Sequence, residues 1–301
     1  MKAREETDHR SGVETDLASR FGAEYMRLGA ETKPALVGLL PEEWSFPGKR
    51  ILDFGCGAGR TLHYFLPEAG EAEFWGADID AASIEMVREH LCPPMHALRC
   101  EVDPPLGLEY CSFDLAWAIS VFTHLTDNSI PWLLELHRLL KPGGLLIATF
   151  MGRYQSELVA GEQWDEDRVG MNVLRHNRWG EGGGPMVLMS EWWVRGHWGR
   201  AFEVLEIAPE IHSQSWAVLR KRDVELTAED LERPENDPRE YAAARHNLVQ
   251  LRGEIELLQQ KHEARFDDLR REFEESSSWR LTRPLRAARQ MADGYRRRLS
   301  P

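Results

Sequence analysis

The chain has 301 residues, enough for one large domain or two smaller ones with a sizeable core. Its 37 basic and 50 acidic side chains give a formal net charge of −13, so we expect no whole-chain attraction to nucleic acid or anionic lipid. The hydrophobic fraction of 42% and the charged fraction of 29% are ordinary for a globular chain and exclude disorder throughout.

The apolar runs and the cysteines of the sequence indicate the compartment and bear on metal binding. The longest apolar run, residues 145–151, is far shorter than the roughly 20 residues of a membrane-spanning helix. Charged residues at the N-terminus are followed by no apolar stretch, so we expect no secretory signal. The cysteines form no CxxC pair and no cluster with histidine, which predicts reduced thiols, no metal site and a cytoplasmic protein (Cys56, Cys92, Cys100 and Cys111).

The first 222 residues predict one α/β domain. A helix is expected over 16–40, interrupted near Gly29 and Pro34, as part of an N-terminal cap (1–49) that packs over the sheet edge or the ligand mouth. From residue 50, short apolar runs alternate with amphipathic stretches, which is typical of βαβ units. We therefore expect a Rossmann-like, doubly wound sheet of seven strands. The predicted strands are 50–54, 73–77, 97–102, 113–118, 144–150, 202–208 and 215–221.

The C-terminal quarter has a different composition. Residues 223–240 hold eight carboxylates, two basic residues and two prolines, and they predict an acidic linker. In 241–275, apolar residues recur at spacings of three and four, with a register shift near Phe266, which predicts a coiled-coil helix. The alternative is a single amphipathic helix folded back on the domain. Residues 276–301 form the chain's basic tail.

One motif carries chemistry. Residues 51–60, ILDFGCGAGR, join a predicted strand to a glycine-rich turn that lets backbone approach a ligand closely, and a helix is expected to follow the turn. The glycines fall as GxGxG, unlike the dinucleotide-binding fingerprint, and an acidic residue at position 53 suits an ammonium group better than a pyrophosphate. The segment resembles motif I of the class I S-adenosylmethionine-dependent methyltransferases. The resemblance implies S-adenosylmethionine as cofactor, bound by Asp53, Gly55, Cys56, Gly57 and Gly59.

Three further segments resemble the same family. The residues that this resemblance assigns to the cofactor are Asp78, for the ribose diol, Ile79, for the adenine face, and Ser120, near the methyl-transfer face. For the backbone that meets the adenine amino group, the position that aligns is Val102 or Asp103. Asp80 is better placed to start the next helix. The sequence LKPGG at residues 140–144 resembles the family's turn before the fifth strand.

Methyl transfer to a hydroxyl requires a general base as well as alignment. His124 follows the fourth predicted strand, where ligands bind in open α/β folds, and is the best candidate, although a histidine there can equally cap or pack. Glu191, His176 and His197 lie in a predicted acceptor lid with a glycine loop at 180–185. The lid region holds six tryptophans that can stack on an acceptor or simply pack the lid (Trp164, Trp179, Trp192, Trp193, Trp198 and Trp216).

The basic tail bears on substrate and location. Residues 276–301 hold seven arginines against one aspartate, a net charge of +6, with apolar residues at near-helical spacing. The segment SWRLTRPLR, residues 278–286, resembles the tails of bacterial surface-polysaccharide assembly enzymes. We therefore expect a cytoplasmic methyltransferase that acts on a sugar of a surface glycan or its precursor.

Other functions and partners stay open at this point. A small-molecule or lipid methyltransferase and a non-catalytic, methyltransferase-like scaffold in glycan assembly are the alternatives. Expected partners are a glycan or other small-molecule acceptor, a second copy or another protein through 241–275, and an anionic membrane surface at the inner face through 276–301. Alternatively, the tail pairs with the acidic body or is solvated.

Overall fold

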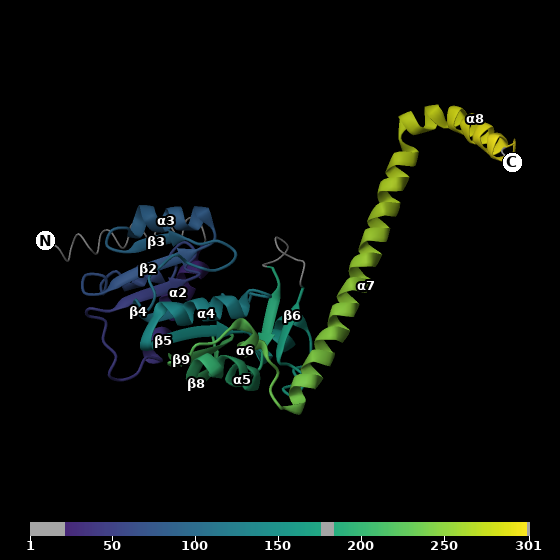
Figure 1. Cartoon of the computed structure of the whole chain (residues 1–301). Helices are drawn as coiled ribbons and strands as arrows, with labels where there is room; N and C mark the ends of the chain where they lie inside the picture. The colour runs from purple at the N-terminus through teal and green to yellow at the C-terminus, as the bar shows by residue number, and fades with distance from the viewer. Residues whose placement is uncertain (1–21, 176–183, 300–301) are drawn as a thin grey trace. The chain divides into compact units, whose positions relative to one another are not determined.

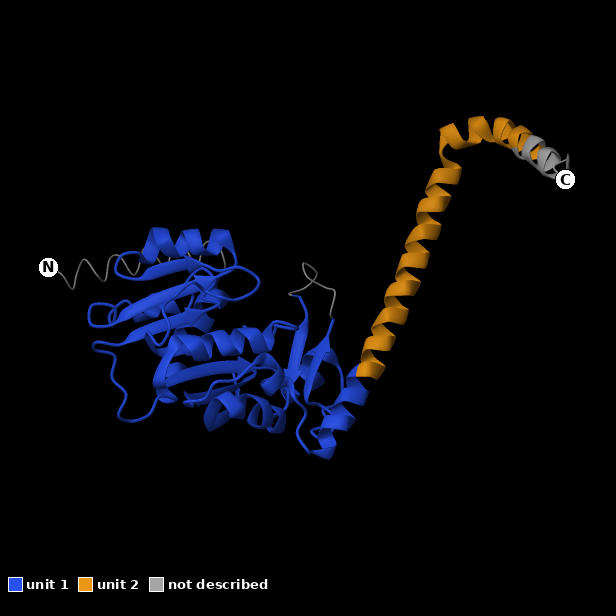
Figure 2. Ribbon diagram, in the orientation of Figure 1, with its two compact units in different colours: residues 1–247 blue, residues 248–301 orange. Residues whose placement is uncertain are grey.

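The computed structural model describes residues 22–175 and 184–299. The start of the predicted first helix, His176, Trp179 and most of the glycine loop lie outside the described residues. The chain divides into two compact units, residues 1–247 and 248–301, which Figure 2 colours separately. They are described one at a time.

A seven-stranded sheet organises the first unit, in the order β3-β2-β1-β4-β5-β9-β8 (Figure 1). β1 to β5 run parallel, whereas β9 pairs antiparallel with both β5 and β8. The strands are β1 (Arg50–Phe54), β2 (Glu73–Asp78), β3 (His96–Arg99), β4 (Phe113–Ala118), β5 (Leu140–Phe150), β8 (Phe202–Ile211) and β9 (Gln214–Lys221). The predicted fold class is confirmed, and the neighbouring strands β1, β2 and β4 bring their carboxyl ends to one edge.

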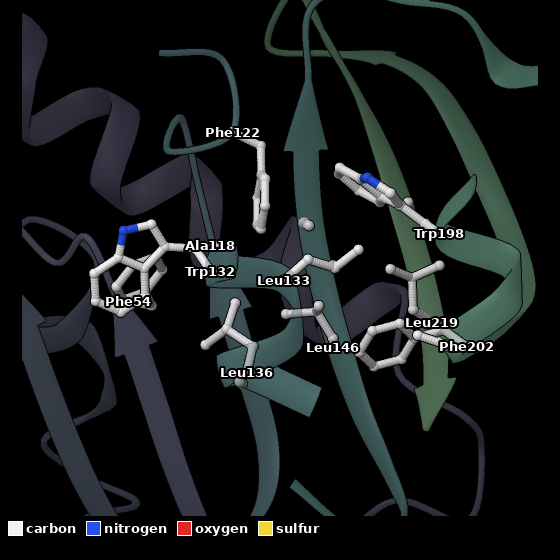
Figure 3. Packing of buried hydrophobic residues seen from close by; sticks show 14 of the residues in the cluster. Phe54, Ala118, Phe122, Trp132, Leu133, Leu136, Leu146, Trp198, Phe202 and Leu219 are labelled. Atoms are coloured by element: carbon white, nitrogen blue, oxygen red, sulfur yellow. The ribbon is translucent and has the colours of Figure 1, made fainter. Parts of the chain in front are cut away.

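Helices cover both faces of the sheet because its strands are apolar on both sides. In β1, Ile51 belongs to one buried cluster, while Leu52 and Phe54 belong to another. The second cluster continues through α4 and α5 and contains Phe54, Trp132, Leu146 and Trp198, which Figure 3 shows. The helices over the two faces are α2 (Ala23–Gly38), η1 (Leu62–Phe65), α3 (Ala81–Leu91), α4 (Ser129–Leu139) and α5 (Glu191–Ala201).

Two helical predictions differ from the structure. α2 runs without interruption through Gly29 and Pro34. Gly29 is required there because a Cβ atom would lie 2.3 Å from the carbonyl oxygen of Arg60, so this glycine marks a close approach of α2 to the glycine-rich turn and no helix end. The helix expected after that turn is only the short 3₁₀ helix η1, followed within a few residues by Pro67 and Gly70.

The chain has an insertion between β5 and α5, and the sequence pattern predicted no helix or strand within it. It contains the π-helical segment η2 (Gln155–Ala160) and an antiparallel pair, β6 (Met171–Leu174) and β7 (Met186–Met189). β7 lies along the carboxyl edge of the main sheet, since Val187 N donates to Thr123 O at 2.9 Å and Met189 N donates to Met151 O at 2.8 Å. The insertion therefore borders the edge where ligands bind in this class of fold.

Several lid tryptophans are core residues. Trp193, Trp198 and Trp216 are at most 8% exposed and lie in the two large clusters. The packing alternative holds for these three, because a buried ring offers no face to an acceptor.

Residues 223–240, which were predicted to be an acidic linker, include a short helix with a buried residue. α6 (Ala228–Glu232) begins with a capping box between Thr227 and Asp230, and its Leu231 is fully buried. α7 (Pro238–Glu275) then begins on the domain, where Ala243 is buried beside Gly170 and Asn247 Nδ2 donates to Met171 O at 2.7 Å.

The second unit consists of the rest of α7 and α8 (Ser277–Leu299), separated by Ser276. On α7, only Ala243, in the first unit, is buried. Among the described residues, no helix is both long and apolar enough to cross a lipid bilayer.

Candidate active site

The glycine-rich turn after β1 is held by the backbone of β2. Gly55 N and Cys56 N both donate to the carbonyl oxygen of Ala77, at 2.7 and 3.1 Å. Gly55, Gly57 and Gly59 all have left-handed backbone angles, with φ of 78°, 54° and 83°. A Cβ atom on Gly55 would lie 2.2 Å from Val121 Cγ2, so the turn is packed against the segment that follows β4.

Asp78 connects this turn to the end of β2. Its Oδ2 accepts from Gly57 N at 2.7 Å and its Oδ1 accepts from Asp80 N at 2.8 Å. Asp80 in turn caps α3, accepting from Ser83 N at 2.8 Å, and hydrogen bonding by the side chain and the backbone of Ser83 lowers the pKa of Asp80. The predicted helix-start role of Asp80 is confirmed.

A cleft of about 460 Å³ opens at the carboxyl ends of β1, β2 and β4. Of the sequence-predicted site residues, it is lined by Gly55, Asp78, Ile79, Val102, Ser120 and His124. Ile79 is 49% exposed, and Val121, Leu125 and Trp132 add apolar surface, whereas carboxylates of Glu101 and Asp103 are also in the lining. The cleft therefore combines an apolar wall with several carboxylates.

Ser120 is held by residues that the sequence analysis did not identify. Its backbone is left-handed, with φ of 60°, its N–H donates to Thr149 Oγ1 at 2.7 Å, and its Oγ accepts from Gln214 Nε2 at 2.8 Å. Gln214 stands after the β8–β9 turn, 94 positions away, so only the folded chain brings it to this site. No local sequence signal marks it.

Val102 takes part in the cleft through its side chain. It is 60% exposed, and its carbonyl oxygen already accepts from Asn128 Nδ2 at 2.8 Å and from Trp132 Nε1 at 2.9 Å. Two donors use both lone pairs of that carbonyl oxygen, so it is not available to accept from the adenine amino group, which is the contact that the resemblance implies for backbone at Val102 or Asp103.

The other motif residues lie behind the cleft. Asp53 is 3% exposed, and burial raises its pKa to about 7, with the Asp78 carboxylate adding to the effect. Burial likewise raises the pKa of Cys56 well above its usual value. Gly57 faces the hydroxyl of Tyr25 on α2, and a Cβ atom on Gly59 would lie 2.7 Å from Leu91 Cδ1. These residues shape the turn from its inner side.

The candidate bases differ in their surroundings. His124 Nδ1 lies 2.8 Å from the carbonyl oxygen of Pro185, which can only accept, so Nδ1 carries the proton and neutral His124 keeps a lone pair on Nε2. His197 is 2% exposed, with Nδ1 2.6 Å from Leu231 O and Nε2 2.8 Å from Glu240 Oε1. Both of its nitrogens are therefore occupied by hydrogen bonds within the domain. Glu191 is an exposed residue in the first turn of α5.

Comparison with known proteins assigns the part of the chain that builds this cleft. Residues 52–146 match the family model described as a methyltransferase domain. Residues 52–146 are therefore similar to a methyltransferase domain.

Whole proteins that share this methyltransferase domain resemble the chain only in part. A 2-methyl-6-phytyl-1,4-hydroquinone methyltransferase from Synechocystis is 28% identical over 122 residues, which are 40% of this chain and 37% of that protein. Phthiotriol/phenolphthiotriol dimycocerosates methyltransferase 1 from Mycobacterium ulcerans is 30% identical over 124 residues, 41% of this chain and 44% of that protein. The chain thus matches less than half of the length of these curated relatives.

The fold comparison agrees with the methyltransferase domain. The crystal structure of an S-adenosylmethionine-dependent methyltransferase from Mesorhizobium loti aligns with a TM-score of 0.50 at 18% identity, over 64% of this chain and 98% of that chain. At this identity the match shows the fold, which is that of the class I enzymes. Among the described residues, no three His, Cys, Asp or Glu side chains gather closely enough to hold a metal ion.

Proposed function

We propose that the protein is an S-adenosylmethionine-dependent methyltransferase. The observation that carries this proposal is the cleft of about 460 Å³ at the carboxyl edge of the methyltransferase domain, bordered by the glycine-rich turn and by Asp78. S-adenosylmethionine supplies an electrophilic methyl group on a sulfonium. The cleft has the mixed chemistry that such a ligand needs, because carboxylates can accept from a ribose diol and apolar side chains can flank an adenine ring.

Within this proposal, each cleft residue has a distinct task. Asp78 binds the ribose, since each of its oxygens keeps a lone pair beyond its one backbone bond. Ile79 and Val102 flank the adenine ring with exposed apolar surface. Ser120 borders the reacting end, where Gln214 and Thr149 fix its position. Asp53 and the glycines set the shape and charge of the turn.

His124 is the proposed general base. The bond from its Nδ1 to Pro185 O selects the tautomer in which Nε2 can accept a proton, and the residue lines the cleft beside Ser120. A base is needed when the acceptor is a hydroxyl, because the oxygen must lose its proton as it attacks the methyl carbon. The reaction that this arrangement supports best is therefore O-methylation.

We propose a sugar hydroxyl of a surface glycan or its precursor as the acceptor. The support is the resemblance of residues 278–286 to tails of surface-polysaccharide assembly enzymes, together with a histidine at the cleft whose Nε2 can accept a hydroxyl proton. A small-molecule or lipid acceptor and a non-catalytic scaffold are the competing functions. The proposal includes self-association or a partner protein through 241–275 and a cytoplasmic location at the inner face of the membrane through 276–301.

The first experiment separates an enzyme from a scaffold. Calorimetry with S-adenosylhomocysteine should detect binding to the full chain, and Asp78→Ala should weaken it by about tenfold or more because it removes a charge-assisted bond. His124→Gln should bind equally well but transfer methyl groups at least a hundredfold more slowly. Absence of binding by the wild-type chain would refute the enzyme proposal. Mass spectrometry of surface glycans from cells with and without the gene tests the acceptor, and unchanged sugar methylation would refute the glycan assignment.

A further inference from the structure

α8 carries an apolar stripe that no other described part of the second unit covers. Leu281, Leu285 and Met291 are 80%, 71% and 71% exposed, and with Ala288 they recur at spacings of three and four. Residues at these spacings lie on one face of a helix. These apolar side chains favour burial, because the free energy falls when each exposed apolar side chain leaves water.

The rest of α8 is basic. Arg280, Arg283, Arg286 and Arg289 follow one another every three residues, so they spread around the sides of the helix that the apolar stripe leaves free. The whole segment 276–301 has a net charge of +6. The part of α7 in the same unit, residues 248–275, differs: it holds five basic and eight acidic residues. The two helices therefore favour different partners.

The junction between the helices is built by specific contacts. Trp279 packs on Phe273 with a ring-centroid distance of 4.4 Å, and the Arg286 guanidinium lies 3.3 Å from the centre of the Trp279 ring. Arg286 also donates to Trp279 O at 2.7 Å, and Trp279 N donates to Ser276 Oγ at 3.3 Å. The motif residues Trp279 and Arg286 thus lock the start of α8, and Trp279 is not part of the apolar stripe.

α8 also lacks the support that a helix of its kind needs in water. It has no described buried residue, and Pro284 removes one backbone donor from its interior. An isolated helix of this composition is marginal in water, because helices gain most of their stability from packing an apolar face. A surface that accepts the stripe would supply that packing.

We propose that α8 is a docking surface for an anionic lipid bilayer. The helix lies in the plane of the interface, with Leu281, Leu285 and Met291 in the acyl boundary and Arg280, Arg283 and Arg289 at the lipid phosphates. A nucleic acid would satisfy the arginines but leave the apolar stripe in water. This inference identifies the surface behind the proposed membrane location, and it is independent of the methyl-transfer reaction.

The test is flotation of the full chain with vesicles. The chain should float with vesicles of phosphatidylcholine and phosphatidylglycerol and remain below vesicles of phosphatidylcholine alone. Arg280→Gln with Arg283→Gln and Arg289→Gln should weaken partitioning about a hundredfold, since each basic residue near an anionic surface contributes roughly a fivefold effect. Added salt should weaken it as well, because the attraction is screened. Leu281→Glu with Leu285→Glu should abolish flotation.

The control is Val249→Glu with Leu257→Glu, which places the same two charges at apolar residues of α7 that are 61% and 45% exposed. It should float like the wild-type chain. Equal binding to neutral vesicles, or loss of flotation in the control as well, would overturn the proposal, as would binding only to a single-stranded oligonucleotide added in place of vesicles. Calorimetry with S-adenosylhomocysteine on the same variants should be unchanged, so a failure here is distinguishable from a failure of the proposed activity.

Discussion

Asp53 is a buried carboxyl at the inner side of the cofactor turn, and it is 3% exposed. The native residue keeps its proton up to about pH 7, whereas an unfolded aspartate releases it near its ordinary pKa of 3.8. The native state therefore binds more protons than the unfolded state between these values. By linkage, this residue makes the protein less stable as the pH rises through that window.

The prediction at this scale concerns Asp53→Asn. Relative to wild type, the variant should raise the melting temperature at about pH 8 and leave it nearly unchanged at about pH 4, where both forms are neutral. The expected gain is of the order of a few kcal/mol, because each unit of pKa difference corresponds to roughly 1.4 kcal/mol. Calorimetric melting at both pH values provides the measurement. A shift of equal size at the two values would contradict the proposed burial of charge.

At the residue scale, the position of a residue at the cleft could be predicted from the sequence where local spacing determines it. Asp78 and Ser120 stand at strand ends that the apolar pattern locates, and both line the cleft. Gln214 and Pro185 were missed because their bonds to Ser120 and His124 span 94 and 61 positions. Such partners become neighbours only through the order of the strands, which a spacing pattern does not specify.

Among the elements, the turn between β1 and η1 depends most strongly on a single residue type. Gly55 combines a left-handed backbone with the close contact to Val121 Cγ2. Gly143 has a similar φ, +72°, but a Cβ atom there would meet nothing within 4 Å. The two glycines therefore separate the effect of backbone strain from the effect of a steric clash.

Gly55→Ala should lower the free energy of unfolding by about 2–4 kcal/mol, because it adds overpacking to strain. Gly143→Ala, the matched control, should lower it by about 1 kcal/mol through strain alone. Adding Val121→Ala to the Gly55 variant should recover part of the loss. Denaturant unfolding measures all three, and equal losses in the two single variants would show that the Val121 contact has no energetic weight.

Strands with a long apolar pattern were predicted from the sequence, whereas strands with a short pattern were missed. The main strands were located within a few residues, since each is a buried apolar run between turn signals. β6 and β7 have only four residues each and stabilise one another from the two ends of the insertion, so neither forms a distinctive pattern. The continuity of α2 was missed for a related reason: tertiary packing on Arg60 outweighs the local preferences of Gly29 and Pro34.

At the scale of the whole molecule, the surface of α7 raises the question of whether a partner chain binds it. Its stripe of exposed apolar residues includes Leu251, Ile255 and Phe266, at 39%, 46% and 67% exposure. The spacing fits the seam of a coiled coil with one register shift. Because its surroundings carry both signs of charge, a second copy of the same helix is a better partner than a lipid surface.

We expect the full chain to self-associate through this stripe. In sedimentation velocity, the wild-type chain should form a dimer, and Leu251→Glu with Ile255→Glu should sediment as a monomer because a buried seam does not accept unpaired charges. Leu257→Glu, at an exposed position on the opposite side of α7, should remain dimeric. A monomeric wild-type chain at all concentrations, or a dimer that survives the paired substitution, would contradict this assignment.

The contacts at the base of α7 affect how the chain can be rearranged. Composition changes at residue 223, but Leu231, Ala243 and Asn247 still pack on or bond to the domain, and the compact unit ends only at residue 247. A fusion junction placed at the change in composition would strip the β6–β7 pair and α5 of their neighbours. The second unit, residues 248–301, can therefore be grafted to another enzyme, or replaced, only by joining helix to helix at about residue 248. The two helices must be joined in register, because no capping residue or loop at that point absorbs an error in helical phase.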